Sequence, residues 1–131
     1  MDIVGIGTDI VECLRIRRLI EQHGERFLRH VYTEREIRFC QARKRAGEYF
    51  AGFWAAKEAV MKCLGTSWKK GVNGTEMEIR LDSGTPRVLL HGAALELARR
   101  LGVGKVLLSI SQCRAYATAY ATALRMPAPP P

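Results

Sequence analysis

The chain has 131 residues, 47% hydrophobic and 26% charged, with a formal net charge of +8 and an isoelectric point near 9.7. This length suits one domain, and the composition is ordinary for a globular protein. No apolar run approaches the ~20 residues of a membrane span, and the start lacks the pattern of a signal peptide, so we expect a cytoplasmic protein. The basic excess predicts an anionic partner, such as nucleic acid, a membrane, a phosphorylated small molecule or an acidic protein.

The cysteines and histidines argue against a disulfide framework and a zinc site. Four cysteines are spread along the chain without a CxxC pair, which indicates reduced thiols. Three histidines form no HExxH motif and no cluster with the spacing of zinc ligands.

The amino end predicts a strand followed by a helix. Residues 2–8 (DIVGIGT) read as a short buried strand, in which Gly5 and Gly7 let a neighbouring element approach the backbone closely. Asp9 follows either as a ligand or as the N-cap of the next helix, with Glu12 completing a capping box, and its position favours the cap. The glycines do not form a GxGxxG fingerprint, so we reject a dinucleotide-binding Rossmann motif.

The following segment predicts helices with a basic outer face. Apolar spacing over residues 11–31 indicates a helix interrupted near His23 and Gly24. Thr33 and Glu36 then form a capping box that predicts a further short helix. The basic residues crowded into this third of the chain are a candidate docking surface; they are Arg15, Arg17, Arg18, Arg26, Arg29, Arg35, Arg38, Arg43, Lys44 and Arg45.

The stretch 50–65 (FAGFWAAKEAVMKCLG) predicts one helix, ended by Gly65, with two different faces. Trp54, Glu58 and Lys62 follow one another at steps of four, so an indole, a carboxylate and an ammonium lie along one face. Glu58 and Lys62 could form a surface ion pair stabilising by about 0.2–0.5 kcal/mol, although their helix is mostly apolar. The neighbouring apolar stripe consists of Phe53, Ala56, Val60 and Leu64.

The last part of the chain mixes strands with one helix. Alternation over residues 116–123 predicts a strand with its tyrosines and threonines on one face. Together, the elements predict an α+β fold with an antiparallel sheet and a long central helix, as a single domain over residues 1–125. A Pro-rich disordered tail should follow over 126–131. The other expected elements are a basic loop over 65–75, a hairpin of 76–81 and 86–90, a helix over 92–101 and a strand over 105–111.

Three stretches carry a resemblance to a known family: GIGTDIVE (5–12), FAGFWAAKEAVMKCLGT (50–66) and SISQCRAYATA (109–119). With them, the chain resembles the holo-(acyl-carrier-protein) synthases of the 4′-phosphopantetheinyl transferase superfamily over nearly its whole length. The order and separation of GTD and WAAKEAxxK make the match specific. The resemblance implies transfer of 4′-phosphopantetheine from coenzyme A to a serine of an acidic apo acyl carrier protein, with release of 3′,5′-ADP. It also implies Mg²⁺ and a homotrimer with its sites at subunit interfaces.

The same resemblance assigns the site residues. Asp9 and Glu58 match the metal ligands, Glu58 and Lys62 match the catalytic pair, and Arg15 and Arg18 match positions that dock the carrier protein. Two carboxylates from distant parts of the chain suit Mg²⁺, which binds through one or two carboxylates together with substrate phosphates. The positions that match the coenzyme A site are Lys62, Gly65, Ser111, Gln112 and Arg114.

Gln112 departs from the family, which usually has histidine at this position, near the adenosine 3′-phosphate and contributed by a neighbouring subunit. Glutamine donates a hydrogen bond but carries no charge. We expect weaker coenzyme A binding unless Arg114, Lys69 and Lys70 compensate.

Three alternatives stay open. One is a basic nucleic-acid-binding module, which we disfavour because no RRM, KH or zinc pattern is present and aromatic residues do not alternate with the basic ones. Another is a non-catalytic homologue that only binds the carrier protein, which the departure at Gln112 makes conceivable. The last is the same chemistry on another carrier, such as one from polyketide assembly.

Overall fold

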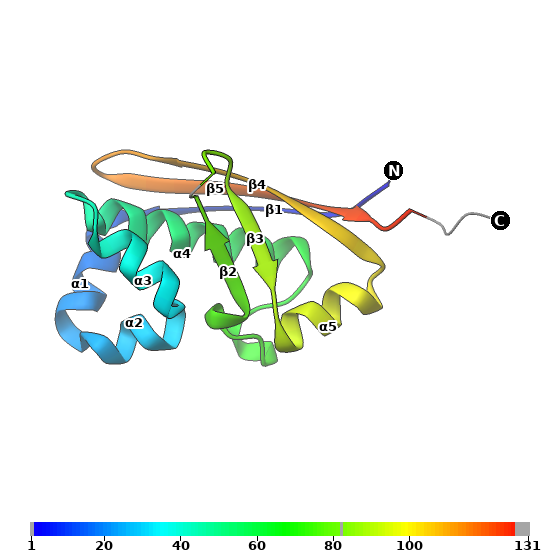
Figure 1. Cartoon of the computed structure of the whole chain (residues 1–131), viewed down its shortest axis with the longest axis horizontal. Coiled ribbons are helices and arrows are strands. Elements are labelled where there is room, and N and C mark those ends of the chain that lie inside the picture. Colours follow the sequence, from blue (N-terminus) through cyan, green and yellow to red (C-terminus); the bar gives the residue numbers. More distant parts are fainter. Residues whose placement is uncertain (1, 82, 128–131) are drawn as a thin grey trace.

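The structure, a computed structural model, describes residues 2–81 and 83–127 and confirms the expected α+β fold (Figure 1). The main antiparallel sheet has the strand order β1-β5-β4, and a smaller sheet pairs β2 with β3. The long helix α4 lies along one face of the main sheet, with α1, α2 and α3 beyond one end and α5 below the other (Figure 1). The elements are β1 (Ile3–Glu12), α1 (Cys13–His23), α2 (Glu25–Val31), α3 (Glu34–Gln41), α4 (Ala46–Cys63), η1 (Trp68–Lys70), η2 (Gly74–Glu76), β2 (Met77–Arg80), β3 (Arg87–Leu90), α5 (Gly92–Arg100), β4 (Val103–Gln112) and β5 (Tyr116–Arg125).

Helix α4 packs closely on the sheet because the facing side chains are small. The central strand β5 turns alanines toward α4 and tyrosines and threonines away from it, as its alternation predicts. On the helix, the predicted apolar stripe is buried, and Phe53 and Val60 are at most 1% exposed. The buried alanines of β5 are Ala117, Ala119, Ala121 and Ala123.

Strand β1 corrects the expectation for the amino end. The strand runs on through Asp9 to Glu12, because this segment stays paired with β5 in register, Asp9 opposite Ala119. Asp9 is therefore not the N-cap of α1; that position is held by Glu12, without a capping hydrogen bond from its side chain. The strand is also not fully buried, since every second side chain faces away from α4.

The glycines of β1 do allow the predicted close approach. A Cβ atom on Gly5 would lie 2.1 Å from the carbonyl oxygen of Cys63, and one on Gly7 would lie 2.0 Å from that of Ala59. Both distances are far inside van der Waals contact, so β1 and the end of α4 touch backbone to backbone.

The remaining elements match the sequence predictions closely. Thr33 and Glu36 form the expected capping box of α3. Gly24, with φ of +54°, breaks the first long helix into α1 and α2. The hairpin β2–β3 forms as expected, although residue 82 in its turn lies outside the described residues, as do 128–131 of the predicted Pro-rich tail.

The face of the main sheet opposite α4 carries exposed apolar side chains. Ile10 is 68% exposed, Ile6 58% and Tyr116 50%. Tyr120 and Leu107 add to the same face, because alternation along each strand turns them away from α4. Across residues 2–81 and 83–127, no helix is both long enough and apolar enough to cross a membrane.

Candidate active site

Lys62 of α4 and Asp9 of β1 meet at one edge of the main sheet. The Lys62 Nζ atom lies 3.2 Å from Asp9 Oδ1 and donates to the Thr8 carbonyl oxygen at 2.9 Å. Thr118 donates from its hydroxyl to the Asp9 carbonyl oxygen at 2.9 Å, which fixes the strand at this point. The Lys62 side chain is 53% exposed, so its ammonium can still reach a ligand from solvent.

Glu58 lies one helical turn before Lys62 on the same face of α4. From Phe50 to Cys63, Trp54, Glu58 and Lys62 are the residues of this helix that are not buried. The alternative of a simple surface pair between Glu58 and Lys62 does not describe them, because Lys62 bonds to Asp9 and Glu58 accepts a hydrogen bond from the Trp68 indole. Trp54, Glu58 and Lys62 therefore form a column of accessible side chains along a helix that is otherwise buried from Phe50 to Cys63.

Asp9 and Glu58 supply the oxygen donors that a hard cation requires. Asp9 contacts Lys62, and Glu58 lies one helical turn before Lys62 on the same face of α4. Within the described residues, no group of three or more His, Cys, Asp and Glu side chains could hold a metal on its own. The donor set fits Mg²⁺, which takes few protein ligands and completes its octahedron with water and phosphate.

The residues expected to bind coenzyme A are not all near this edge. Gly65, with φ of +70°, follows the end of α4, as predicted for the residue that ends the helix. Ser111 and Gln112 lie on β4, on the far side of β5 from Asp9, and they point to opposite faces of the sheet. Arg114 is exposed in the β4–β5 turn. Within one chain, strand β5 therefore lies between Asp9 and the strand that carries Ser111 and Gln112.

The local setting of Gln112 is tight. Its Oε1 atom would lie 2.4 Å from a Cβ atom on Gly52, so the amide packs against the backbone of α4. Its side chain is half-buried, whereas Ser111 is exposed on the outer face of the sheet. Gln112 therefore faces α4, and Ser111 faces away from it.

Arg15 and Arg18 are exposed on α1, as docking residues must be. They line a shallow hollow of about 380 Å³ together with other side chains of β1 and α1. The Arg15 guanidinium lies 5.9 Å from the centre of the Trp54 ring, at the start of the column that leads to Glu58. Leu28 is buried and belongs to the core, and Phe27 packs against that core.

The sequence reasoning missed a buried ion pair. Lys57 and Glu36 are both fully shielded from solvent, with Lys57 Nζ 2.8 Å from Glu36 Oε1. Lys57 also donates to the carbonyl oxygens of Gly74 and Met77, each at 2.7 Å, and Glu36 accepts from the backbone N–H of Ile79 at 2.6 Å. Burial raises the pKa of the Glu36 carboxyl, and the Lys57 ammonium opposes that rise.

A signal for this pair does exist in the sequence. Lys57 is four residues after Phe53 and three before Val60, so it belongs to the apolar stripe of α4 rather than to its polar column. A lysine in such a stripe requires a buried acid, because an unpaired buried charge is very unfavourable. Trp68 was also missed, and its place in a basic loop gives no comparable signal.

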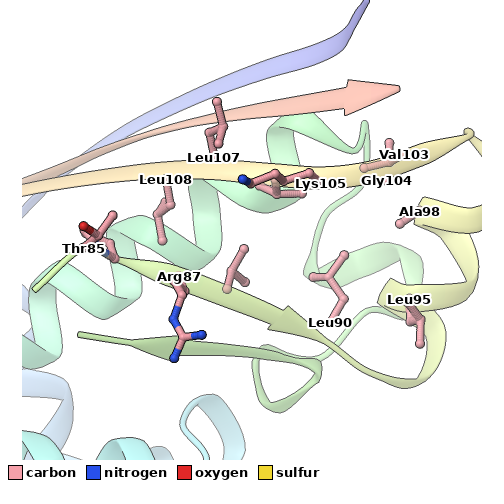
Figure 2. A pocket seen from close by; sticks show the side chains of 13 residues that line it. Thr85, Arg87, Leu90, Leu95, Ala98, Val103, Gly104, Lys105, Leu107 and Leu108 are labelled. Atoms are coloured by element: carbon pink, nitrogen blue, oxygen red, sulfur yellow. The ribbon is translucent and has the colours of Figure 1, made fainter. Parts of the chain in front are cut away.

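A separate cavity contains none of the predicted site residues. It has a volume of about 530 Å³ and lies between β3, α5 and β4, as Figure 2 shows. Leu90, Leu95 and Leu108 contribute to its mostly apolar lining. A smaller hollow of about 270 Å³ includes Lys62 and Tyr120 and adjoins the candidate site.

Comparison with known proteins identifies the relatives of the chain. The profile of the 4′-phosphopantetheinyl transferase superfamily matches residues 5–121. A holo-[acyl-carrier-protein] synthase from Ruminiclostridium cellulolyticum is 48% identical over 119 residues, covering 88% of each chain. The crystal structure of holo-[acyl-carrier-protein] synthase from Neisseria meningitidis superposes with a TM-score of 0.84 at 32% identity, covering 95% of this chain and 100% of that one.

A structure with a bound nucleotide is also similar. The holo-(acyl-carrier-protein) synthase from Bacillus anthracis, solved in complex with CoA (3′,5′-ADP), has a TM-score of 0.77 and 32% identity, covering 95% of this chain and 98% of that one. The matched residues 5–121 include the parts of β1 and α4 on which Asp9, Glu58 and Lys62 lie.

Proposed function

The chain belongs to the 4′-phosphopantetheinyl transferase superfamily, among the holo-[acyl-carrier-protein] synthases, and on this premise we propose that Asp9, Glu58 and Lys62 form its active site. It is an enzyme that transfers 4′-phosphopantetheine from coenzyme A to apo acyl carrier protein. The observation that carries the site is the column on α4: from Phe50 to Cys63 only Trp54, Glu58 and Lys62 are not buried, and Lys62 is bonded to Asp9.

Each side chain has a distinct part in the proposed reaction. A serine oxygen of the carrier protein forms a bond to the β-phosphorus of coenzyme A, and the bond from that phosphorus to the oxygen of 3′,5′-ADP breaks. Lys62, held by Thr8 and Asp9 and half exposed, binds the diphosphate oxygens. Glu58 accepts the serine proton, as a general base within reach of the same phosphate.

We propose that Asp9 and Glu58 also hold Mg²⁺. Their two carboxylates suit a cation that keeps several waters and takes substrate phosphates as further ligands. When bound, the cation would supply positive charge against the diphosphate. Lys62, which bonds to Asp9, supplies part of that charge from the protein itself.

We propose a homotrimer with active sites at subunit interfaces. The exposed Ile6, Ile10 and Tyr120 on the outer face of the sheet form an apolar surface of the kind that protein interfaces cover. The hollow beside Lys62 also includes Ile6 and Tyr120, so a subunit seated on this face would border the active site.

The distribution of the coenzyme A residues supports the same arrangement. Ser111, Gln112 and Arg114 lie across the sheet from Asp9 in one chain, so a neighbouring chain is the natural source of these groups at each site. Multi-angle light scattering should give three times the 14.7 kDa mass of the chain. Ile10→Arg should lower that mass and weaken coenzyme A binding together; a wild-type monomer would contradict the proposal.

We propose further that Arg15 and Arg18 dock the acidic carrier protein. Both are exposed on one helix, beside a shallow hollow, and the net charge of +8 favours an acidic partner. We assign the transferase domain to residues 1–125 and the location to the cytoplasm, which suits a chain whose four cysteines are thiols.

Mass spectrometry tests the proposal directly. Purified apo acyl carrier protein is incubated with this protein, coenzyme A and Mg²⁺, and a parallel reaction contains EDTA. We expect the carrier to gain the mass of one phosphopantetheine, and the gain to disappear with EDTA. No gain with several acidic carriers would favour a protein that only binds its carrier, and Gln112→His would then be the first restoration to try.

A further inference from the structure

We propose that Trp68 is a positioning residue for Glu58, holding the carboxylate in its reactive orientation through the indole N–H. This inference rests on the proposed function, because it requires Glu58 to act in the transfer. It adds a role for the loop between α4 and β2, which lies outside the motifs that identify the family.

The contact itself is direct. Trp68 Nε1 donates to Glu58 Oε1 and approaches it closely. An ionised carboxylate has two oxygens with about four acceptor sites, so one hydrogen bond fixes the group while the other oxygen stays available. A fixed indole donor therefore selects one orientation of Glu58 without using up its capacity to accept a proton or a cation.

The indole is held in turn by stacking. The Trp68 and Trp54 rings lie 5.4 Å apart at 21°, and Trp54 stacks on Phe27 with centroids 6.1 Å apart. The edge of the Trp68 ring lies against Gly74, where a Cβ atom would be 2.7 Å from Trp68 Cη2. The row Phe27–Trp54–Trp68 thus reaches from α2 to Glu58 with little room to shift.

The loop that carries Trp68 is fastened at its far end by the buried ion pair. Lys57 donates to the carbonyl oxygens of Gly74 and Met77, and Glu36 holds Lys57. Lys57 and Glu58 are sequence neighbours on α4 that point in different directions, one into the core and one into the site. The helix therefore carries both the carboxylate and the lysine that fastens the loop supporting it.

The test removes the N–H and keeps the ring. Trp68 is replaced by benzothienylalanine, an isostere with sulfur in place of the indole nitrogen, and Trp68→Phe serves as a second variant. A lost hydrogen bond to a charged group should lower kcat about 10- to 100-fold. The KM for coenzyme A and for the carrier should stay within about threefold, because neither substrate contact is removed. Circular dichroism and mass in solution check that each variant folds and assembles.

Trp54 offers a matched control, because the chain has two tryptophans and Trp54 makes its contacts with Phe27, Trp68 and Arg15 through its ring. The same isostere at Trp54 keeps those ring contacts and removes no hydrogen bond to Glu58, so it should lower kcat by less than the isostere at Trp68 does. A readout independent of activity is the exchange of the two indole N–H protons with water, followed by NMR. Glu58→Ala should speed exchange at Trp68 more than at Trp54.

The possible outcomes distinguish the positioning role of Trp68 from the proposed role of Glu58 in the transfer. If Glu58→Gln is inactive but the Trp68 isostere keeps kcat within twofold of wild type, the positioning role is wrong and the proposed function stands. If the isostere raises kcat, the indole obstructs Glu58 and the inference is equally overturned. If Glu58→Gln itself stays active, the proposed role of Glu58 fails, and the positioning role fails with it, whether or not NMR detects the contact.

Discussion

Lys57 and Lys62 are five residues apart on α4, and each pairs with a carboxylate from another element, yet the two pairs are built for different purposes. Lys57 and Glu36 are completely buried, and backbone groups complete their hydrogen bonds. The Lys62 side chain is half exposed, and its bonds to Thr8 and Asp9 leave part of the ammonium facing solvent. A closed pair fixes the fold, whereas an open pair is free to bind an anion.

The contrast follows from position on the helix and not from residue type. Lys57 shares the stripe of Phe53 and Val60, which packs against the core, and Lys62 shares the column of Trp54 and Glu58, which does not. Substitutions in the column are therefore expected to alter catalysis, whereas substitutions in the stripe are expected to alter stability.

The largest expected effect is the loss of stability on breaking the closed pair. Lys57→Met leaves the Glu36 carboxylate buried without its cation, which should reduce the free energy of unfolding by about 3–5 kcal/mol. Urea denaturation of the assembled protein measures it. The double variant Lys57→Met with Glu36→Leu should recover only part of the loss: no buried charge is left unpaired, but the backbone groups of Gly74, Met77 and Ile79 lose their hydrogen-bond partners.

The free energy of unfolding of the Lys57→Met variant should also depend on pH, in a direction set by the Glu36 carboxyl. Burial raises the pKa of the Glu36 carboxyl, and this variant lacks the ammonium that opposes the rise. A carboxyl with a higher pKa folded than unfolded binds its proton in the folded state, so stability is lost as pH increases through the folded pKa. The deficit relative to wild type should therefore be smaller at pH 5 than at pH 8; a deficit independent of pH would mean that the loss of Lys57 does not change the protonation of Glu36 in the folded state.

The next effect concerns activity and should leave the fold intact. Lys62→Met removes the ammonium of the open pair and should lower kcat/KM about 100- to 1,000-fold, as expected when a group that stabilises developing charge is lost. Its free energy of unfolding should change by less than about 1 kcal/mol, because the Lys62 side chain is half exposed. A loss of stability as large as that of Lys57→Met would remove the distinction between the pairs.

A smaller effect concerns the contribution of the exposed pair Lys62–Asp9 to stability. Asp9→Asn should change stability by no more than about 1 kcal/mol at low salt, and that change should shrink at 1 M salt, where charges are screened within about 3 Å. Thermal melts of wild type and variant at two salt concentrations measure the difference. Lys57→Met serves as the comparison, since its deficit should hardly respond to salt.

The smallest expected effect is a difference between the rates at which two cysteine thiols are alkylated. Cys63 follows Lys62 in sequence but is buried, and burial raises its pKa to about 11. Cys113 is exposed. At pH 8 an alkylating reagent should modify one thiol per chain quickly and Cys63 at least about 100-fold more slowly. Peptide mapping after short exposure identifies the site, and early labelling of Cys63 would show that the end of α4 opens readily.

Much of this arrangement could be predicted from the sequence. The periodicity of α4 separates its buried stripe from its column, and the capping box of Thr33 and Glu36 marks the start of α3 correctly. Both signals are local, since they depend on residues within a few turns of each other. The proposed site residues Asp9, Glu58 and Lys62 were assigned by resemblance, and the structure adds the contact of Lys62 with Asp9.

Long-range contacts account for what the sequence analysis missed. Asp9 was expected to cap α1, but pairing with Ala119, more than a hundred residues later, keeps it in the strand. Glu36 served as a capping residue in the prediction, and only the folded chain brings Lys57 to the same carboxylate. Trp68 reaches Glu58 from the three-residue helix η1, which is too short for periodicity to indicate the direction of a side chain.

The alanines on the inner face of β5 have a consequence for motion as well as for packing. This central strand is hydrogen-bonded on both edges, to β1 and to β4, and α4 covers its inner face too closely for water to enter between small side chains. Its amides should be among the last in the molecule to exchange with deuterium, opening only when the whole domain unfolds. The exchange rate of the β5 amides should thus report global unfolding under conditions in which the protein is still fully active.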